Sequence, residues 1–88
     1  MIVRVNRKFL KDLALLPLKE RKRIEEIVFE ISPNCNSCAE IPGASKLKGY
    51  SHYYKIRIGN YRIGLRCKPD ELVFERVLHR KEIYRYYP

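Results

Sequence analysis

The residues best suited to chemistry in this 88-residue chain lie on one short segment, "YYKIRIGNYRIGLRCK", residues 53–68. A Gly59-Asn60 dipeptide separates two runs of alternating character, which is typical of a two-residue β-hairpin. In such a hairpin Arg57 lies directly opposite Arg62. Like charges on opposed residues destabilise a sheet, because their Cβ atoms are only about 5 Å apart. We therefore expect an anion to lie between these cations.

The alternation gives the hairpin two faces. Its apolar face carries Tyr54, Ile56, Ile58, Tyr61, Ile63 and Leu65. Its cationic face carries Tyr53, Lys55, Arg57, Arg62 and Arg66. The net charge of +9 is equally uneven: residues 1–43 hold 8 Lys/Arg and 6 Asp/Glu (8 − 6 = +2), and residues 44–88 hold 11 and 4 (11 − 4 = +7). A basic field concentrated in one half indicates a polyanionic partner, either nucleic acid or an acidic protein segment.

Phosphodiester cleavage is a reaction that such a face could perform. The face has no carboxylate cluster, so we expect no metal and no two-metal mechanism. RNA supplies its own nucleophile, the 2′-OH, and needs a base, a cation to stabilise charge on phosphorus and an acid for the leaving 5′ oxygen. Lys55 is the candidate base, because surrounding arginines favour a neutral amine. Arginine binds phosphate bidentately and stays charged.

Tyrosines cluster near this face in the sequence, and two interpretations of them remain open. Tyr53, Tyr84, Tyr86 and Tyr87 could stack on exposed RNA bases, as recognition of single-stranded RNA requires. The terminal tyrosines could equally pack along the edge of the sheet.

The cysteines are Cys35, Cys38 and Cys67. An odd count in a chain that shows no signal peptide argues against a disulfide scaffold. Tetrahedral zinc needs four ligands, and the chain adds only His52 and His79 as distant candidates. The "CNSC" motif lies in a loop rich in Pro and Ser. We expect it to be a structurally incidental pair.

The elements that must position these residues form a single domain, residues 1–88, with an α+β fold of order β-α-α-β-β-β. The sequence predicts a strand at 1–6, helices at 6–16 and 18–31, a loop at 32–51, the hairpin, a last strand at 72–78 and a short C-terminal helical turn. The helices carry core-facing stripes: Phe9, Leu10, Leu13 and Leu16, then Ile24, Ile27, Val28 and Ile31.

We expect the two helices to form an antiparallel hairpin packed on the apolar face of a small, mostly antiparallel sheet. The cationic face is then left open. No apolar run approaches the ~20 residues of a membrane span. A cytoplasmic protein without a membrane partner is the expectation.

Three stretches, "KLKGY", "YYKIRIGNYRIGLR" and "VLHRKEIYR", resemble the RelE/ParE toxin superfamily, specifically the RelE-like mRNA interferases of type II toxin–antitoxin modules. The resemblance covers essentially the whole chain. It implies a ribosome-dependent endoribonuclease that cuts mRNA through a 2′,3′-cyclic phosphate without a cofactor. It also implies two kinds of partner: a cognate antitoxin, and the ribosome with its mRNA and rRNA.

The resemblance also implies roles for individual residues. The catalytic set that matches is Lys55, Arg57, Arg62, Arg80 and Tyr84. Residues expected to bind substrate are Lys48, Tyr53, Arg66, His79, Lys81 and Tyr86. Arg80, Lys81 and His79 remain alternatives for the acid, and Tyr86 could replace Tyr84. Two other functions stay open: a ParE-like toxin that inhibits DNA gyrase by binding it, and an inactive relative that only binds its antitoxin.

Overall fold

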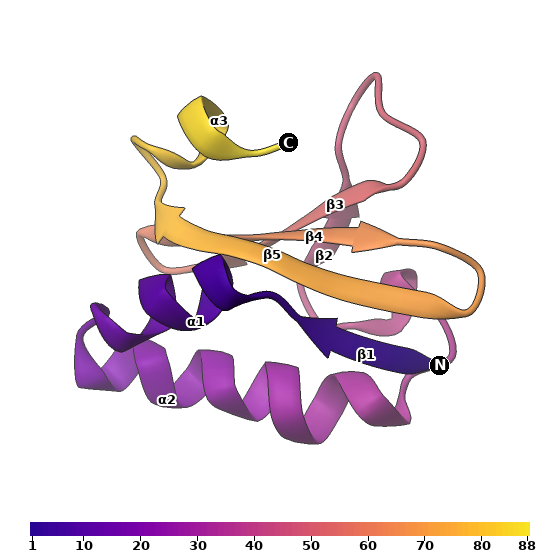
Figure 1. Ribbon diagram of the computed structural model, residues 1–88, viewed down its shortest axis with the longest axis horizontal. Coiled ribbons are helices and arrows are strands. Elements are labelled where there is room, and N and C mark those ends of the chain that lie inside the picture. The colour runs from indigo at the N-terminus through magenta and orange to yellow at the C-terminus, as the bar shows by residue number, and fades with distance from the viewer.

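The protein folds around one five-stranded sheet that has helices on both faces (Figure 1). The structure is a computed structural model, and it describes residues 1–88. The strands are ordered β1-β5-β4-β3-β2 across the sheet. The elements are β1 (Ile2–Val5), α1 (Arg7–Ala14), α2 (Leu18–Glu26), β2 (Ala44–Lys46), β3 (Tyr53–Ile58), β4 (Tyr61–Cys67), β5 (Glu71–His79) and α3 (Ile83–Tyr86). A π-helical segment, Ile27–Ile31, continues α2. None of the helices is long and apolar enough to cross a membrane.

The predicted hairpin is confirmed in register. Arg57 pairs with Arg62 and Ile56 with Ile63 across β3 and β4, and Gly59 takes a φ of +56° in the turn, where glycine has no Cβ penalty. Strand β1 runs parallel to β5, and the other neighbouring strands are antiparallel. The α+β class and the mostly antiparallel sheet are therefore as the sequence predicts.

One strand was missed. Residues 44–46 form β2, which pairs antiparallel with β3 inside the segment expected to be loop. Ala44 pairs with Ile56, and the backbone N–H of Leu47 donates to the Tyr53 carbonyl at 2.8 Å. Three residues are too few to show an alternating pattern, so only the long-range pairing reveals this strand.

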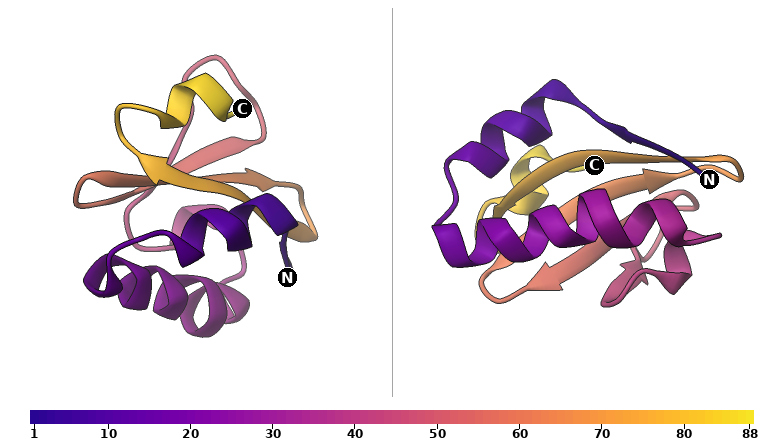
Figure 2. Two further views of the ribbon diagram at one scale, coloured as in Figure 1. Left: turned by 60° about the vertical axis from the view of Figure 1, so that its left-hand side comes forward. Right: turned by 90° about the horizontal axis from the view of Figure 1, so that it is seen from below.

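The main core lies between the sheet and the helices α1 and α2 (Figure 2). Helix α1 begins as predicted, with the Asn6 side chain accepting from the Phe9 N–H at 3.0 Å. The apolar face of the hairpin points into this core, where Ile56, Ile63 and Leu65 are fully buried. From helices α1 and α2 and the π-helical segment come Phe9, Leu13, Ile24, Ile27 and Val28.

The predicted core-facing stripe of α1 was wrong at one residue, Leu10. Leu10 is 47% exposed, and Asp12 is buried instead. The Asp12 carboxylate accepts hydrogen bonds from Arg76 at 2.7 and 3.0 Å and from the Val77 N–H at 3.1 Å. Because β1 pairs only with residues 71–74 of β5, the second half of β5 has a free edge there, and Asp12 satisfies part of it.

The cationic face is less open than expected. Helix α3 lies on it, opposite α1 and α2 (Figure 2). A second, small core forms there from Leu47, Ile83 and Tyr87, with Tyr53 and Leu78 packed against it. A four-residue helix is stabilised by such packing rather than by its own propensity, so its docking site could not be read from the local pattern.

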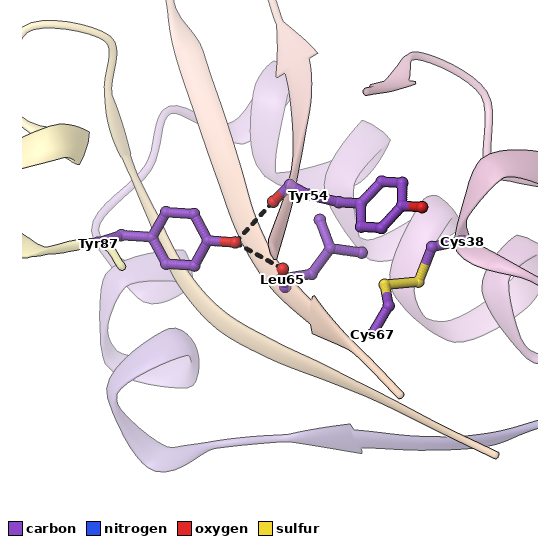
Figure 3. The surroundings of a disulfide bond; sticks show 5 residues. All are labelled: Cys38, Tyr54, Leu65, Cys67 and Tyr87. Carbon is purple, nitrogen blue, oxygen red and sulfur yellow. Dashed lines mark hydrogen bonds between the residues drawn. A yellow bond between two sulfur atoms is a disulfide. The ribbon is translucent and has the colours of Figure 1, made fainter. Parts of the chain in front are cut away.

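The prediction about the cysteines was also wrong. Cys38 forms a disulfide with Cys67, with their Cα atoms 6.4 Å apart, and Cys35 is free and buried (Figure 3). The odd count reflects one pair plus a core residue whose thiol donates to the Ile31 carbonyl. The disulfide joins the segment before β2 to the end of β4. The "CNSC" motif is therefore not incidental, because its second cysteine forms this disulfide.

Candidate active site on the cationic face

A cleft of about 580 Å³ opens on the cationic face beside α3. It is lined by Gly43, Ser45, Lys55, Arg57, Arg62, Arg80, Lys81 and Tyr84. All residues expected to be catalytic therefore line one cavity, although they come from β3, β4, the segment after β5 and α3. The lining contains no carboxylate. Elsewhere, too, no three His, Cys, Asp or Glu side chains come together as a possible metal site.

The opposed arginines form the cationic centre of the cleft. Arg62 Nη1 donates to the carbonyl oxygens of Gly59 at 2.8 Å and Tyr61 at 2.9 Å, which holds the guanidinium at the hairpin turn. Burial, and after it the charges of Arg57 and Arg80, lower the pKa of Arg62. A guanidinium remains charged at neutral pH even so. The site is thus a pair of adjacent cations without a counter-ion from the protein, and Arg62 is the one held in place by hydrogen bonds.

Lys55 and Tyr84 meet on another wall of the cleft. The Lys55 ammonium donates to the Tyr84 hydroxyl at 3.2 Å and lies 5.8 Å from the centre of its ring. The Tyr84 side chain is 57% exposed, so its ring keeps a free surface. An exposed aromatic ring beside a cationic pair can stack on a nucleobase whose phosphate the cations bind.

Arg80 and Lys81 reach the cleft because the end of β5 lies beside the hairpin turn. The Arg80 N–H donates to the Asn60 carbonyl at 2.8 Å, and Tyr61 pairs with His79 in the sheet. Both cationic side chains are exposed. They add charge from a part of the sequence about twenty residues away from the hairpin, so the cleft collects cations from three segments.

Comparison with known proteins identifies the family. Residues 3–84 match the family model described as the ParE toxin of the type II toxin–antitoxin system, parDE. The chain belongs to the RelE/ParE toxin superfamily. It is accordingly a toxin of a type II toxin–antitoxin system, of the RelE-like kind.

The relatives agree with this assignment. The toxin is 49% identical over 81 residues to Toxin RelE3 of Methanocaldococcus jannaschii, covering 91% of each chain. It is similar to the toxin chain in the crystal structure of the RelB-RelE antitoxin-toxin complex from Methanococcus jannaschii, with 46% identity and a TM-score of 0.82 over 97% of this chain and 99% of that one. The toxin-antitoxin complex RelBE2 from Mycobacterium tuberculosis, at 23% identity and a TM-score of 0.67 over 89% and 95%, shows the shared fold alone.

Several residues expected to bind substrate lie outside the cleft lining. Arg66 Nε lies 3.6 Å from the Glu75 carboxylate, and Tyr53 packs in the small core under α3. Lys48 is exposed in the loop between β2 and β3 and does not line the cavity. These three side chains therefore lie apart from the cations that line the cleft.

His79 and Tyr86 also point elsewhere. His79 Nδ1 accepts from the Lys81 N–H at 3.2 Å, and its ring meets Tyr61 edge-on at 5.6 Å. The Tyr86 ring lies 5.3 Å from the guanidinium carbon of Arg76, outside the cleft lining. Of the four tyrosines proposed to stack on a base, only Tyr84 lines the cleft.

Gly43 and Ser45, which were not predicted from the sequence, also line the cleft, at the wall contributed by β2 and the residue before it. Gly43 has a φ of +80°, a backbone conformation that glycine adopts readily, and it turns the chain into β2. A Pro-Gly pair in a loop signals such a turn. Only the pairing of β2 with β3 brings that turn to the cationic face.

Proposed function

We propose that the toxin is a ribosome-dependent endoribonuclease that cleaves mRNA without a metal, through attack of the 2′-OH on the adjacent phosphodiester. The observation that carries this proposal is the assembly of Lys55, Arg57, Arg62, Arg80 and Tyr84 around one cleft. A cavity whose charged side chains are all cationic fits a phosphate, and an exposed ring at its rim fits a base.

The two opposed arginines would bind the scissile phosphate. A guanidinium matches two phosphate oxygens with two parallel N–H groups, and neither arginine in this pair is neutralised by a protein carboxylate. As the 2′ oxygen bonds to phosphorus, negative charge on the phosphoryl oxygens increases. Arg62, which two hydrogen bonds already hold in the folded protein, would stabilise this charge without reorganisation, and a contact of this kind is worth roughly 10²–10³ in rate.

Lys55 would take the proton from the 2′-OH, so its amine must be neutral when the oxygen attacks. The bond from phosphorus to the 5′ oxygen breaks, and that oxygen takes a proton from an acid at the other side of the cleft. Lys81 suits this role better than Arg80, because an ammonium gives up a proton far more easily than a guanidinium. The products are a 2′,3′-cyclic phosphate and a 5′-hydroxyl end, and no oxidant or metal enters the balance.

Tyr84 would stack on a base next to the cleaved bond. Its ring stands beside Lys55, so stacking would bring the 2′-OH toward the amine. RNA binding by the remaining cations would be salt-dependent and largely indifferent to sequence. The ribosome would supply the rest of the positioning, by presenting the mRNA in a fixed conformation.

We further propose a small antitoxin as the protein partner. The solved relative at 46% identity is a complex of a toxin with its antitoxin. An acidic or amphipathic segment that folds on binding would suit the cationic face, and it would neutralise or displace the residues around Arg62 and Arg80. A complex in which the antitoxin touches only residues 33–45 would contradict this proposal.

The second candidate is a gyrase-inhibiting toxin, and the description of the matching family model as a ParE toxin favours it. Mapping of mRNA ends in cells after induction separates the two functions. Cuts at fixed positions within in-frame codons support the nuclease. Intact mRNA together with broken DNA or altered supercoiling supports the gyrase inhibitor.

A further inference from the structure

Gly64 is the one glycine in the sheet, and it lies on the cationic face in the middle of β4. It stands directly opposite Lys55 on β3 and Arg76 on β5. A Cβ built on Gly64 would lie 2.5–2.6 Å from three atoms of the Tyr87 ring. No side chain fits in that space while the ring is there. The glycine therefore forms a seat in the sheet for a residue near the C-terminus.

Tyr87 fills this seat and is only 2% exposed. Its hydroxyl lies 2.5 Å from the Leu65 carbonyl oxygen and 2.7 Å from that of Tyr54, so its single proton is shared between two acceptors (Figure 3). The Tyr53 ring meets the Tyr87 ring edge-on at 5.8 Å. Burial, together with the charge of Glu75, raises the pKa of the Tyr87 hydroxyl.

These contacts fix the helical turn that carries Tyr84. The Tyr87 N–H donates to the Ile83 carbonyl at 2.9 Å, closing the turn, and Ile83 is itself 1% exposed. Tyr84 follows Ile83 on the side facing the cleft, where its hydroxyl meets Lys55. Arg80 is held separately, by its N–H bond to the Asn60 carbonyl. A change at Tyr87 should thus move Tyr84 and leave Arg80 in place.

We propose that Tyr87 is a positioning residue for the cleavage reaction: seated on Gly64, it fixes α3 so that Tyr84 stays against Lys55. The inference rests on the proposed function for its effect on rate, but not for its effect on geometry. It predicts that the Tyr87 ring matters more than the hydroxyl, because the ring fills the space over Gly64. It also predicts that Tyr87 acts through Tyr84.

The first test is single-turnover cleavage on programmed ribosomes with Tyr87→Ala, Tyr87→Phe and Phe29→Ala, the last an exposed aromatic residue on the π-helical segment, outside the cleft, as matched control. Tyr87→Ala should slow cleavage on the order of 10²-fold at saturating ribosomes, as a misplacement of about 1 Å can do, without weakening ribosome binding. Tyr87→Phe should stay within about tenfold of wild type. In a double-mutant cycle with Tyr84→Ala, the Tyr87→Ala loss should largely disappear. Wild-type cleavage by Tyr87→Ala, or losses that add in the cycle, would overturn the proposal.

The second test does not depend on cleavage. Nuclear Overhauser contacts between the Tyr84 ring and the Lys55 ε-methylene should be present in wild type, Tyr87→Phe and Phe29→Ala and lost in Tyr87→Ala. If Tyr87→Ala does not fold, Tyr87→Val, which leaves most of the ring's space over Gly64 empty, takes its place in both tests. Contacts retained in the Ala or Val variant would refute the positioning role. If the wild-type protein cleaves no mRNA but Tyr87→Ala still loses the contacts between Tyr84 and Lys55, the proposed nuclease function is refuted and the positioning role of Tyr87 is upheld.

Discussion

Replacing Arg62 with Ala tests most directly whether the opposed arginines hold a phosphate. In the free toxin this side chain works against folding: burial and the charge of Arg57 lower its pKa, so the folded state disfavours the cation. The side chain also makes two hydrogen bonds, from Nη1 to the Gly59 and Tyr61 carbonyls. Both bonds lie at the hairpin turn, one exposed and one partly buried, where such contacts contribute little.

The two effects oppose each other and are both small, so the free energy of unfolding should change by less than about 1 kcal/mol. The rate should change far more. Losing one fixed cation at the developing phosphate charge costs roughly 10²–10³ in rate, which corresponds to about 2.7–4 kcal/mol in the activation free energy. A loss of activity without a loss of stability is therefore the expected signature.

The assay is single-turnover cleavage of mRNA on programmed ribosomes, with urea unfolding of the same preparations. Arg62→Lys is a second variant to measure. It keeps the positive charge and loses the planar guanidinium, so its cleavage rate should lie between those of wild type and Arg62→Ala. Arg4→Ala is the matched control, because Arg4 pairs with Glu71 on the far edge of the sheet. A wild-type rate in Arg62→Ala would mean that the opposed arginines are not catalytic, and the reasoning would fail.

Three further predictions follow from individual contacts. Lys55→Ala should lower the cleavage rate by roughly 10²–10⁴-fold, because the base is lost. Its affinity for the ribosome, measured by filter binding, should be nearly unchanged, because the other cations still bind rRNA. Equal losses in rate and affinity would contradict the role of Lys55 as base. Replacing both Cys38 and Cys67 with Ser should lower the free energy of unfolding by about 3–4 kcal/mol, since the bond closes a loop with a sequence separation of 29; unchanged urea midpoints would refute this. Folding raises the pKa of the Tyr87 hydroxyl, so its contribution to stability is complete below the unfolded pKa of about 10 and is lost as the pH rises toward the folded pKa. Wild type should therefore lose more of its free energy of unfolding between pH 9 and 11 than Tyr87→Phe does. Parallel stability curves for the two proteins would refute this prediction.

The hairpin could be predicted from the sequence because everything that determines it is local. The Gly-Asn turn fixes the register, and the alternation decides which side chains enter the core. Asn6 at the start of α1 is equally local, since a cap needs only its own neighbours. The pairing of Arg57 with Arg62 in the site could be predicted together with the hairpin, because the two residues lie opposite each other on its strands.

The features that could not be predicted from the sequence are set by contacts between residues far apart in the chain. Asp12 lies three residues after Phe9, so the spacing places it on the buried side of α1, but its burial is favourable because Arg76 and the Val77 N–H, 64 and 65 residues away, donate to its carboxylate. Cys38 similarly finds a partner 29 residues away and not the nearby Cys35. No local pattern distinguishes these pairings from their alternatives.

The alternation that folds the hairpin is also what separates stability from activity in this toxin. Arg57 and Arg62 occupy the positions next to Ile56 and Ile63, and a slip of one residue would bury the cations and expose the core residues. Cations on the outward side can therefore crowd at little cost to the core that fixes their register. Gly64 is the exception, because there the outward side is itself buried, under Tyr87. Substitutions in the cleft should change activity alone, whereas a side chain at Gly64 should change the stability and the activity together.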